Sequence, residues 1–341
     1  MKVLVTGGAG YIGSHTCLSL LRLGHEVAVV DNLDNGHEAA LARVQRLSNR
    51  TLTFNQCDVR DADALDRAFK QFAPDAVIHF AGLKAVGQSV AEPAQYYEVN
   101  VGGTATLLKA MERSGCLNIV FSSSATVYGE PQYLPCDENH PLDPINPYGR
   151  TKLIGEKLLQ DWSSAMKGRR AVALRYFNPV GADVSGLIGE DPNGVPNNLM
   201  PYISQVAVGR RECLYVFGDD YETIDGTGVR DYIHVLDLAD AHIAAVENID
   251  QFEPFEVFNI GTGAGLSVLE MVKEFEKQSG RPVAYRISQR RQGDAPAVWA
   301  DATKARDKID FRASRGIVEM CQDTWRWQCN NPTGYSRVKL S

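Results

Sequence analysis

A tyrosine and a lysine four residues apart form a pair that could do acid–base chemistry. Tyr148 and Lys152 begin a stretch with helical periodicity, 148–165, and this spacing places both side chains on one helix face. A nearby ammonium group favours the phenolate and lowers the pKa of a tyrosine, which then acts as a general base near neutral pH. The same spacing also occurs on solvated helix faces, so the interpretation depends on further residues.

Three consecutive serines supply such residues. Ser122, Ser123 and Ser124 follow the apolar run 119–121 and precede Tyr148 by about two dozen positions. A hydroxyl at this point can bridge a substrate hydroxyl and the tyrosine. A serine run is often only a polar exit from a strand, so its combination with the tyrosine and lysine carries the hypothesis.

A glycine-rich turn lies near the start of the chain. Gly7, Gly10 and Gly13 form G-x-x-G-x-x-G between the apolar run 3–5 and a helical pattern over 12–23. Glycine permits a tight turn and a close approach of ligand to backbone, and the helix N-terminus favours an anion. In this strand–helix context the motif predicts dinucleotide binding, whereas alone it is also compatible with a turn that binds nothing.

Two aspartates end the next apolar runs. Asp31 follows the run 27–30, where a carboxylate accepts hydrogen bonds from ribose hydroxyls. It would repel a 2′-phosphate, and no basic residue follows in 32–34, so NAD is favoured over NADP. A capping aspartate is the alternative for Asp31. Asp58, after the run 52–54, either contacts the adenine edge or ends a turn.

The elements that position these residues alternate between strand and helix. Short apolar runs at 3–5, 27–30, 52–54, 76–78, 119–121 and 172–174 are separated by helical patterns, including 61–72, 94–113 and 148–165. Such runs are typical of a parallel sheet covered on both faces. We therefore predict a doubly wound, Rossmann-like α/β fold, in which ligands bind at the carboxyl ends of the strands.

The pattern becomes irregular after about residue 178. Glycine and proline are frequent over 179–201, and a helical pattern returns over 268–278. The 341 residues suit two domains. We predict a Rossmann-like NAD-binding domain over 1–177 and a smaller mixed α/β substrate domain over 178–341.

Composition excludes several classes of protein. Lys and Arg number 35 against 42 Asp and Glu, a net charge of −7, which argues against nucleic-acid binding. No apolar run reaches the length of a membrane span. The seven cysteines are widely spaced without a C-x-x-C pair, so a metal site has no support and reduced thiols in a cytoplasmic protein are expected.

Several segments together resemble a known family. TGGAGYIG at 6–13, FAG at 80–82, SSSATVYG at 122–129 and YGRTK at 148–152 are similar to the extended short-chain dehydrogenase/reductases. RYFNPVGA at 175–182 and GTGVRDYIHV at 226–235 resemble the UDP-glucose 4-epimerase branch of that family. The resemblance covers essentially the whole chain.

The resemblance implies an NAD-dependent isomerase that interconverts UDP-galactose and UDP-glucose through a 4-keto intermediate. Tyr148 would take the proton of the sugar 4-hydroxyl, with Ser124 bridging, and Lys152 would also hold the nicotinamide ribose. The implied cofactor contacts are Gly7, Gly10, Tyr11, Ile12, Gly13, Asp31, Asn32, Asp58, Val59, Phe80, Ala81, Gly82, Lys84, Asn100, Ser122, Tyr148, Lys152 and Phe177. A packing role is the alternative for Asn100.

The second domain would bind the UDP-sugar. The implied substrate contacts are Ser124, Tyr148, Asn178, Asn198, Leu199, Phe217, Arg230, Arg291, Asp294 and Val298. Arginine forks suit a diphosphate, although Arg230 and Arg291 could equally form structural ion pairs. Some relatives carry a tyrosine at the position of Val298, and the smaller residue predicts room for a 2-acetamido group, hence activity on UDP-GalNAc and UDP-GlcNAc.

Two other functions remain alternatives. A nucleotide-sugar 4,6-dehydratase begins with the same hydride step but places Asp-Glu after the strand-end serine, where this chain has Ala125 and Thr126. A non-catalytic dinucleotide sensor would not need Tyr148 and Lys152. The family resemblance also implies a homodimer that pairs the helices over 94–113 and 148–165.

Overall fold

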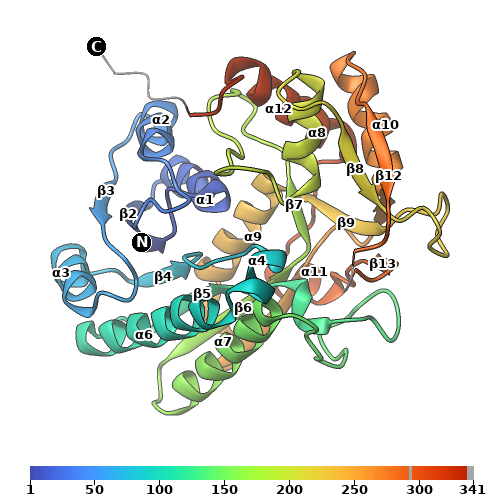
Figure 1. Cartoon of the computed structure of the whole chain (residues 1–341). Coiled ribbons are helices and arrows are strands. Elements are labelled where there is room, and N and C mark those ends of the chain that lie inside the picture. Colours follow the sequence, from blue (N-terminus) through green and yellow to red (C-terminus); the bar gives the residue numbers. More distant parts are fainter. Residues whose placement is uncertain (292–293, 336–341) are drawn as a thin grey trace.

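The computed structural model describes residues 1–291 and 294–335 and is built around a seven-stranded sheet (Figure 1). The strands run in the order β10-β6-β5-β4-β1-β2-β3, and every neighbouring pair is parallel. Their bounds are β1 (Lys2–Thr6), β2 (Glu26–Asp31), β3 (Thr53–Gln56), β4 (Ala76–His79), β5 (Asn118–Ser122), β6 (Arg170–Tyr176) and β10 (Phe255–Ile260). This confirms the predicted Rossmann-like fold class.

Helices cover both faces of this sheet because its central strands bury apolar side chains toward both sides. In β1, Val3 and Val5 enter one core, shared with α1, α2, α9 and α11, and Leu4 enters the opposite core, shared with α3, α6 and α7. The first set spans α1 (Tyr11–Arg22), α2 (Glu38–Ser48), α9 (Val235–Glu247) and α11 (Thr303–Ile309). The second spans α3 (Ala62–Phe72), α6 (Gly103–Ser114) and α7 (Pro147–Ser164).

Local sequence signals fix the start of the helix that carries the tyrosine and lysine. The side chain of Asn146 accepts a hydrogen bond from the backbone N–H of Gly149 at 2.8 Å, and Pro147 occupies the first helical turn. Both features favour a helix N-terminus at this point. α7 therefore begins one residue before the predicted start.

A smaller part of the chain lies beyond one edge of the main sheet, at the upper right of Figure 1. It contains the strands β7 (Asn178–Val180), β9 (Val229–His234), β11 (Gly265–Ser267) and β13 (Ala297–Val298), with β9 central. A second sheet pairs β8 (Leu214–Phe217) with β12 (Tyr285–Ser288). The helices α8 (Leu199–Ala207), α10 (Val268–Ser279) and α12 (Ile317–Asn330) share an apolar core with these strands.

The chain returns to the main sheet after residue 178, which the sequence analysis did not expect. β10 pairs with β6 as the edge strand, and α9 packs against α1. The sheet therefore has seven strands where six were predicted. The division at 177/178 stays a prediction, and α9 and β10 belong structurally with the first part of the chain.

The helix expected over 94–113 is interrupted. The structure has α4 (Val86–Ala91), α5 (Pro93–Tyr96), the π-helical turn η1 (Tyr97–Gly102) and then α6. A π-helical turn widens the helix and often occurs near functional sites. Short 3₁₀ turns complete the secondary structure, η2 (Ala125–Tyr128) and η3 (Ile249–Gln251).

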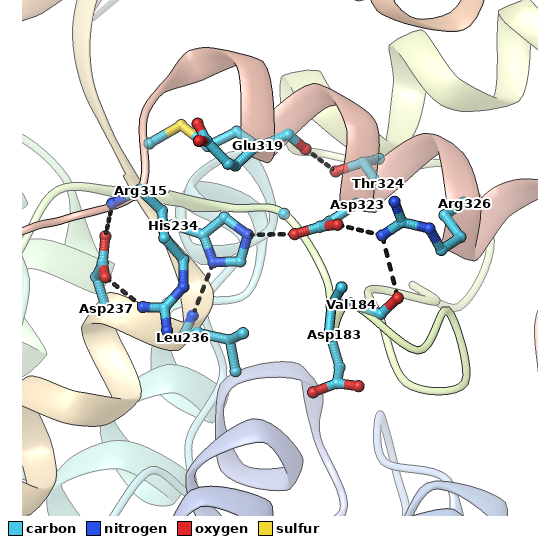
Figure 2. Close-up of polar contacts among 12 residues, drawn as sticks. Asp183, Val184, His234, Leu236, Asp237, Arg315, Glu319, Asp323, Thr324 and Arg326 are labelled. Atoms are coloured by element: carbon cyan, nitrogen blue, oxygen red, sulfur yellow. Dashed lines mark hydrogen bonds and ion pairs between the residues drawn. The ribbon is translucent and has the colours of Figure 1, made fainter.

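A buried polar cluster joins β9 and α9 to α12 (Figure 2). His234 caps α9, because its Nδ1 accepts a hydrogen bond from the N–H of Leu236 at 3.1 Å. Its Nε2 therefore carries the proton that is donated to Asp323 Oδ2 at 3.3 Å, and Asp323 also pairs with Arg326. Arg315 binds Asp237 in the same region. The cluster ties the smaller part of the chain to the helix layer of the main sheet.

No helix in the described ranges is long and apolar enough to cross a membrane.

Candidate functional site

A cavity of about 340 Å³ opens at the carboxyl ends of the central strands. It brings together all but two of the predicted cofactor residues: Gly7, Gly10, Tyr11, Ile12, Gly13, Asp31, Asn32, Asp58, Val59, Phe80, Ala81, Gly82, Lys84, Ser122, Tyr148 and Lys152. The location agrees with the expectation that ligands of a doubly wound sheet bind at strand ends. The binding roles of the individual residues stay predictions.

The glycines of the first turn allow backbone segments to approach closely. Gly7 has a φ of +71°, and a Cβ there would lie 2.7 Å from the backbone nitrogen of Ala81. A Cβ on Gly13 would lie 2.2 Å from the carbonyl oxygen of Gly7. The turn is therefore tight enough to leave the N-terminus of α1 open toward the cavity, as a bound pyrophosphate requires.

Asp31 is held rigidly at the end of β2. Its Oδ2 accepts a hydrogen bond from Ala9 N at 3.0 Å, and its Oδ1 accepts one from Leu33 N at 2.8 Å. Each carboxylate oxygen keeps a further lone pair, which suits ribose hydroxyls. Burial raises the pKa of Asp31, while these backbone hydrogen bonds act in the opposite direction. The side chain is thus a fixed acceptor at the cavity wall.

Asp58 lines the cavity and is also engaged in local contacts. Arg60 donates to it from Nε at 2.8 Å and from Nη2 at 2.9 Å, and Asn32 donates from Nδ2 at 3.0 Å. The hydrogen bonds from Arg60 lower the pKa of Asp58 to about 2. Both sequence-based alternatives for Asp58 therefore have support, since it ends a turn and faces the cavity.

Lys152 lies inside the protein beside the tyrosine. Its Nζ donates to the carbonyl oxygen of Ser122 at 2.8 Å and lies 5.8 Å from the ring centroid of Tyr148. Burial lowers the pKa of Lys152 to about 8, and Glu156 acts in the opposite direction. The i, i+4 spacing thus brings both side chains to one buried face of α7.

The pKa of Tyr148 does not follow the sequence-based expectation. Burial raises it well above the ordinary value, Tyr176 raises it further, and the hydroxyl of Ser124 acts in the opposite direction. The expected lowering of this pKa by Lys152 is therefore wrong, because desolvation of the phenolate dominates. A further positive charge beside the ring would lower this pKa.

Ser124 is oriented by the short turn η2. Its Oγ accepts hydrogen bonds from the N–H of Thr126 at 3.2 Å and from the hydroxyl of Thr126 at 3.0 Å. Because the oxygen is an acceptor in both, the proton of Ser124 is free to be donated elsewhere. Ser124 does not belong to the cavity lining found among residues 1–291 and 294–335.

Asn100 and Phe177 are the two predicted cofactor residues outside that lining in the described ranges. Asn100 exchanges hydrogen bonds with the backbone of Leu83 at 2.8 and 3.0 Å and donates to Thr151 Oγ1 at 2.9 Å. It fixes the loop after β4 against α7, which is the packing alternative. Phe177 is buried in an apolar cluster with Val127 and Tyr128.

Apart from Ser124 and Tyr148, the predicted substrate residues are distributed over the smaller part of the chain. Arg291 pairs with Asp294 at 3.1 Å and lies over the ring of Phe217 at 5.4 Å. Val298 lies beside Arg230 in the register of β13 and β9. Asn178 is exposed in β7, and Leu199 begins α8. Of the predicted substrate residues, Tyr148 alone belongs to the described cavity lining.

Glu190 links the two groups of residues. Its Oε1 accepts hydrogen bonds from Lys84 Nζ at 3.1 Å and from Asn198 Nδ2 at 2.8 Å. Tyr11 makes a second link by donating to the carbonyl oxygen of Gly181 at 2.7 Å. These contacts close one side of the cavity with the segment that follows β6 in the chain.

Sequence reasoning missed several residues of the cavity wall. They include Tyr176, Glu190, Asp191 and Tyr335. Tyr176 ends β6, so the rule that ligands bind at strand ends could have found it. Glu190, Asp191 and Tyr335 lie in irregular or remote segments, where no local pattern indicates the contact.

Residues 3–261 match the NAD dependent epimerase/dehydratase family. The chain belongs to this family. It is 56% identical to UDP-glucose 4-epimerase 2 of Arabidopsis thaliana, over 98% of this chain and 97% of that one. It is 55% identical to UDP-glucose 4-epimerase of Bacillus subtilis, over 99% and 100% of the two chains.

A solved structure of the same family has the same fold. UDP-glucose 4-epimerase of Bifidobacterium longum, in complex with NAD⁺ and UDP, superposes with a TM-score of 0.95 at 49% identity and covers 98% of this chain and 100% of that one. The predicted membership of an NAD-dependent epimerase family is confirmed.

Proposed function

We propose that the chain interconverts UDP-glucose and UDP-galactose with a bound NAD. The observation that carries the proposal is the buried pair of Tyr148 and Lys152 at the inner end of the cavity. This is where a general base must lie to reach a sugar hydroxyl beside a dinucleotide. Relatives that are more than half identical over nearly the whole chain act, by name, as UDP-glucose 4-epimerases, so the expected reaction is supported.

The residues present fit NAD. The close approach around Gly7 and Gly13 leaves the backbone of the first turn free of side chains. Asp31 offers acceptors for ribose hydroxyls and a negative charge against a 2′-phosphate. Bound there, NAD would supply the acceptor and donor of a hydride at C4 of the sugar.

The chain's own residues move the proton. Tyr148 accepts the proton of the 4-hydroxyl, and Ser124 can relay it because its own oxygen accepts from Thr126. Lys152, held by the Ser122 carbonyl, stabilises the phenolate electrostatically. Burial raises the pKa of Tyr148, and a cationic group beside the ring would lower it.

The alternative functions are not favoured. Dehydration needs a carboxylic acid and a carboxylate directly after Ser124, and Ala125 and Thr126 supply neither. A sensor would not need the buried lysine, whose desolvation has a cost that a purely structural site would avoid.

We propose that the smaller part of the chain, over 178–341, binds the UDP group, and that 1–177 supplies the NAD site. Arg291, Asp294 and Phe217 already lie together, and an arginine fork suits a diphosphate. The second arginine candidate, the half-buried Arg230, donates from its side chain only to the carbonyl of Val229 at 2.8 Å in the described contacts. Its remaining donors suit phosphate oxygens.

Val298 is proposed to set the size of sugar that the site accepts. It packs beside Phe177 and Tyr128 and next to Arg230 in the sheet. Val298→Tyr is expected to abolish turnover of UDP-N-acetylglucosamine, because the added ring fills the space for a 2-acetamido group. Turnover of UDP-glucose should stay within about 3-fold of the wild-type value, because steric rejection acts only on the larger substrate. Both turnovers are measured by proton NMR, and an equal response of the two would contradict the steric hypothesis.

We propose a homodimer formed through the helices over 94–113 and 148–165. Ile154 on α7 is 39% exposed, so its apolar side chain is accessible to a partner helix. Light scattering coupled to gel filtration is expected to give twice the mass of one chain, and Ile154→Glu should shift it toward a monomer. A monomer in the wild-type protein would reject the dimer.

We propose a cytoplasmic location. All seven cysteines are unpaired, which suits a reducing compartment. Cell fractionation with an antibody against the protein tests this, and recovery in a membrane or secreted fraction would contradict it.

The first test of the activity is proton NMR of UDP-galactose incubated with purified protein and no added cofactor. Appearance of UDP-glucose establishes 4-epimerisation and shows that NAD is purified with the protein. If nothing changes, and added NAD does not restore conversion, the UDP-hexose assignment fails.

A further inference from the structure

A buried ion pair lies one helical turn beyond Lys152. Arg175 donates to Glu156 from Nε at 2.9 Å and from Nη2 at 2.7 Å, and both side chains are less than 5% exposed. Burying two charges has a large desolvation cost, and an apolar pair of similar size is often more stable. The pair does not line the described cavity, and packing alone does not explain why two charged residues occupy this buried position.

The ion pair is connected to the serine turn. Ser123, which is fully buried, donates from Oγ to Glu156 Oε1 at 2.5 Å. The two flanking serines contact the proposed acid–base pair. The carbonyl of Ser122 accepts a hydrogen bond from Lys152, and the hydroxyl of Ser124 lowers the pKa of Tyr148 against the effect of burial. Each of the three serines therefore has a different partner, and the central one, Ser123, is hydrogen-bonded to Glu156.

Glu156 also places a negative charge near Lys152. Burial lowers the pKa of Lys152, and Glu156 opposes that effect. Burial acts against the charge of Arg175 as well, but its hydrogen bonds to Glu156 hold the pKa of Arg175 above the ordinary value. The titratable or charged groups that face this region are Tyr148 on α7, His79 on β4, Arg175 and Tyr176 on β6, Tyr128 on η2 and Glu138 in the following loop.

We propose that Glu156 is a positioning residue for the epimerisation site. It ties Ser123 to α7 and so keeps the neighbouring carbonyl of Ser122 and hydroxyl of Ser124 in place for Lys152 and Tyr148, while Arg175 orients Glu156 through two hydrogen bonds. The inference rests on the proposed function, because it assigns Glu156 a role in that reaction.

The tie is tested by comparing two buried serine substitutions. Ser123→Ala removes the hydrogen bond to Glu156, whereas Ser163→Ala, at a buried position of α7, removes only a bond to the carbonyl of Gln160. Ser123→Ala is expected to lower kcat by about 10- to 100-fold with little change in KM, because a small misplacement of catalytic groups has effects of this size. Ser163→Ala should keep the wild-type kcat.

The charge is tested by the pH profile. Glu156→Gln leaves Arg175 buried without its partner, so a double variant, Glu156→Met with Arg175→Met, removes both charges and preserves packing. Without the carboxylate the pKa of Lys152 falls, and its ammonium form is lost at lower pH. The alkaline limb of the kcat profile is therefore expected to move down by about one pH unit or more, whereas Ser123→Ala, which keeps the charge, should leave the limb in place.

The outcomes separate the two proposals. If the wild-type protein does not convert UDP-galactose in the same assay, the proposed function fails. If the wild type is active and Ser123→Ala retains its full kcat, the positioning role is overturned, whether or not the double variant folds. A folded double variant with the wild-type alkaline limb would overturn the charge effect.

Discussion

Tyr148→Phe is expected to lower epimerase turnover by about 1,000-fold while the protein stays folded and keeps its NAD. The substitution removes one oxygen atom and no ring, so the packing of this 7% exposed side chain persists. General acid–base catalysis by a positioned side chain contributes about 10²- to 10⁴-fold to a rate, and all of that contribution is lost. Lys152 keeps its hydrogen bond to the carbonyl of Ser122, so cofactor retention is not expected to change.

The measurement is kcat for UDP-galactose together with the NAD released on denaturation and the melting temperature. Tyr202→Phe is the matched control and should retain turnover. Tyr202 lies on α8 and packs against the apolar core of the smaller part of the chain. A Tyr148→Phe protein with wild-type turnover would show that the base is another group. Lost turnover with full NAD content would exclude a sensor, because a sensor has no turnover that depends on this hydroxyl.

The sequence predicted the centre of the fold because the central strands are buried on both faces. Continuous apolar runs such as 3–5 and 119–121 have no polar side to place in water, so a parallel sheet between helices follows. The chemistry-bearing residues were then located by one rule, that ligands bind at the carboxyl ends of such strands. This is why Gly7, Asp31 and Ser122, far apart in sequence, were assigned to one site, whereas Tyr148 was assigned by its spacing to Lys152 and by the family resemblance.

The edge of the sheet and the π-helical turn could not be predicted in this way. β10 is apolar enough to be a strand, but its partner β6 lies some 80 residues earlier, and local periodicity does not encode a long-range pairing. The stretch over 94–113 has a continuous helical pattern, and the widened turn over 97–102 depends on contacts such as those of Asn100 with Leu83.

The pKa of Tyr148 shows a second limit of prediction from the sequence. The i, i+4 spacing reports that Lys152 is near, but the sign of the shift depends on how much water reaches the phenol. Burial is a tertiary property, and here it outweighs the neighbouring charge. The residues proposed for the UDP group were likewise placed only by resemblance, because β7, β8, β9 and β13 contribute one residue each.

Gly13→Ala is expected to remove NAD from the purified protein. The added Cβ would lie 2.2 Å from the carbonyl oxygen of Gly7 and 2.8 Å from the Cα of Gly8, and both are backbone atoms. Gly7 cannot move aside freely, since its N–H donates to the carbonyl of Val30 at 2.8 Å and its Cα faces the backbone of Ala81. The turn must therefore shift away from the N-terminus of α1, where the pyrophosphate would bind.

The matched control is Gly102→Ala. Gly102 has a helical φ of −59°, and no atom lies within 4 Å of its added Cβ. Overpacking at Gly13 is expected to lower the free energy of unfolding by about 1–3 kcal/mol, and loss of a ligand that binds only the folded state lowers the melting temperature further. At Gly102, alanine should raise the free energy of unfolding by about 0.4–1 kcal/mol, because it restricts the unfolded chain. The amount of NAD released on denaturation tests whether cofactor binding depends on the tight turn. Equal amounts from both variants would mean that it does not. Loss of NAD from Gly13→Ala alone would support a pyrophosphate site at this turn.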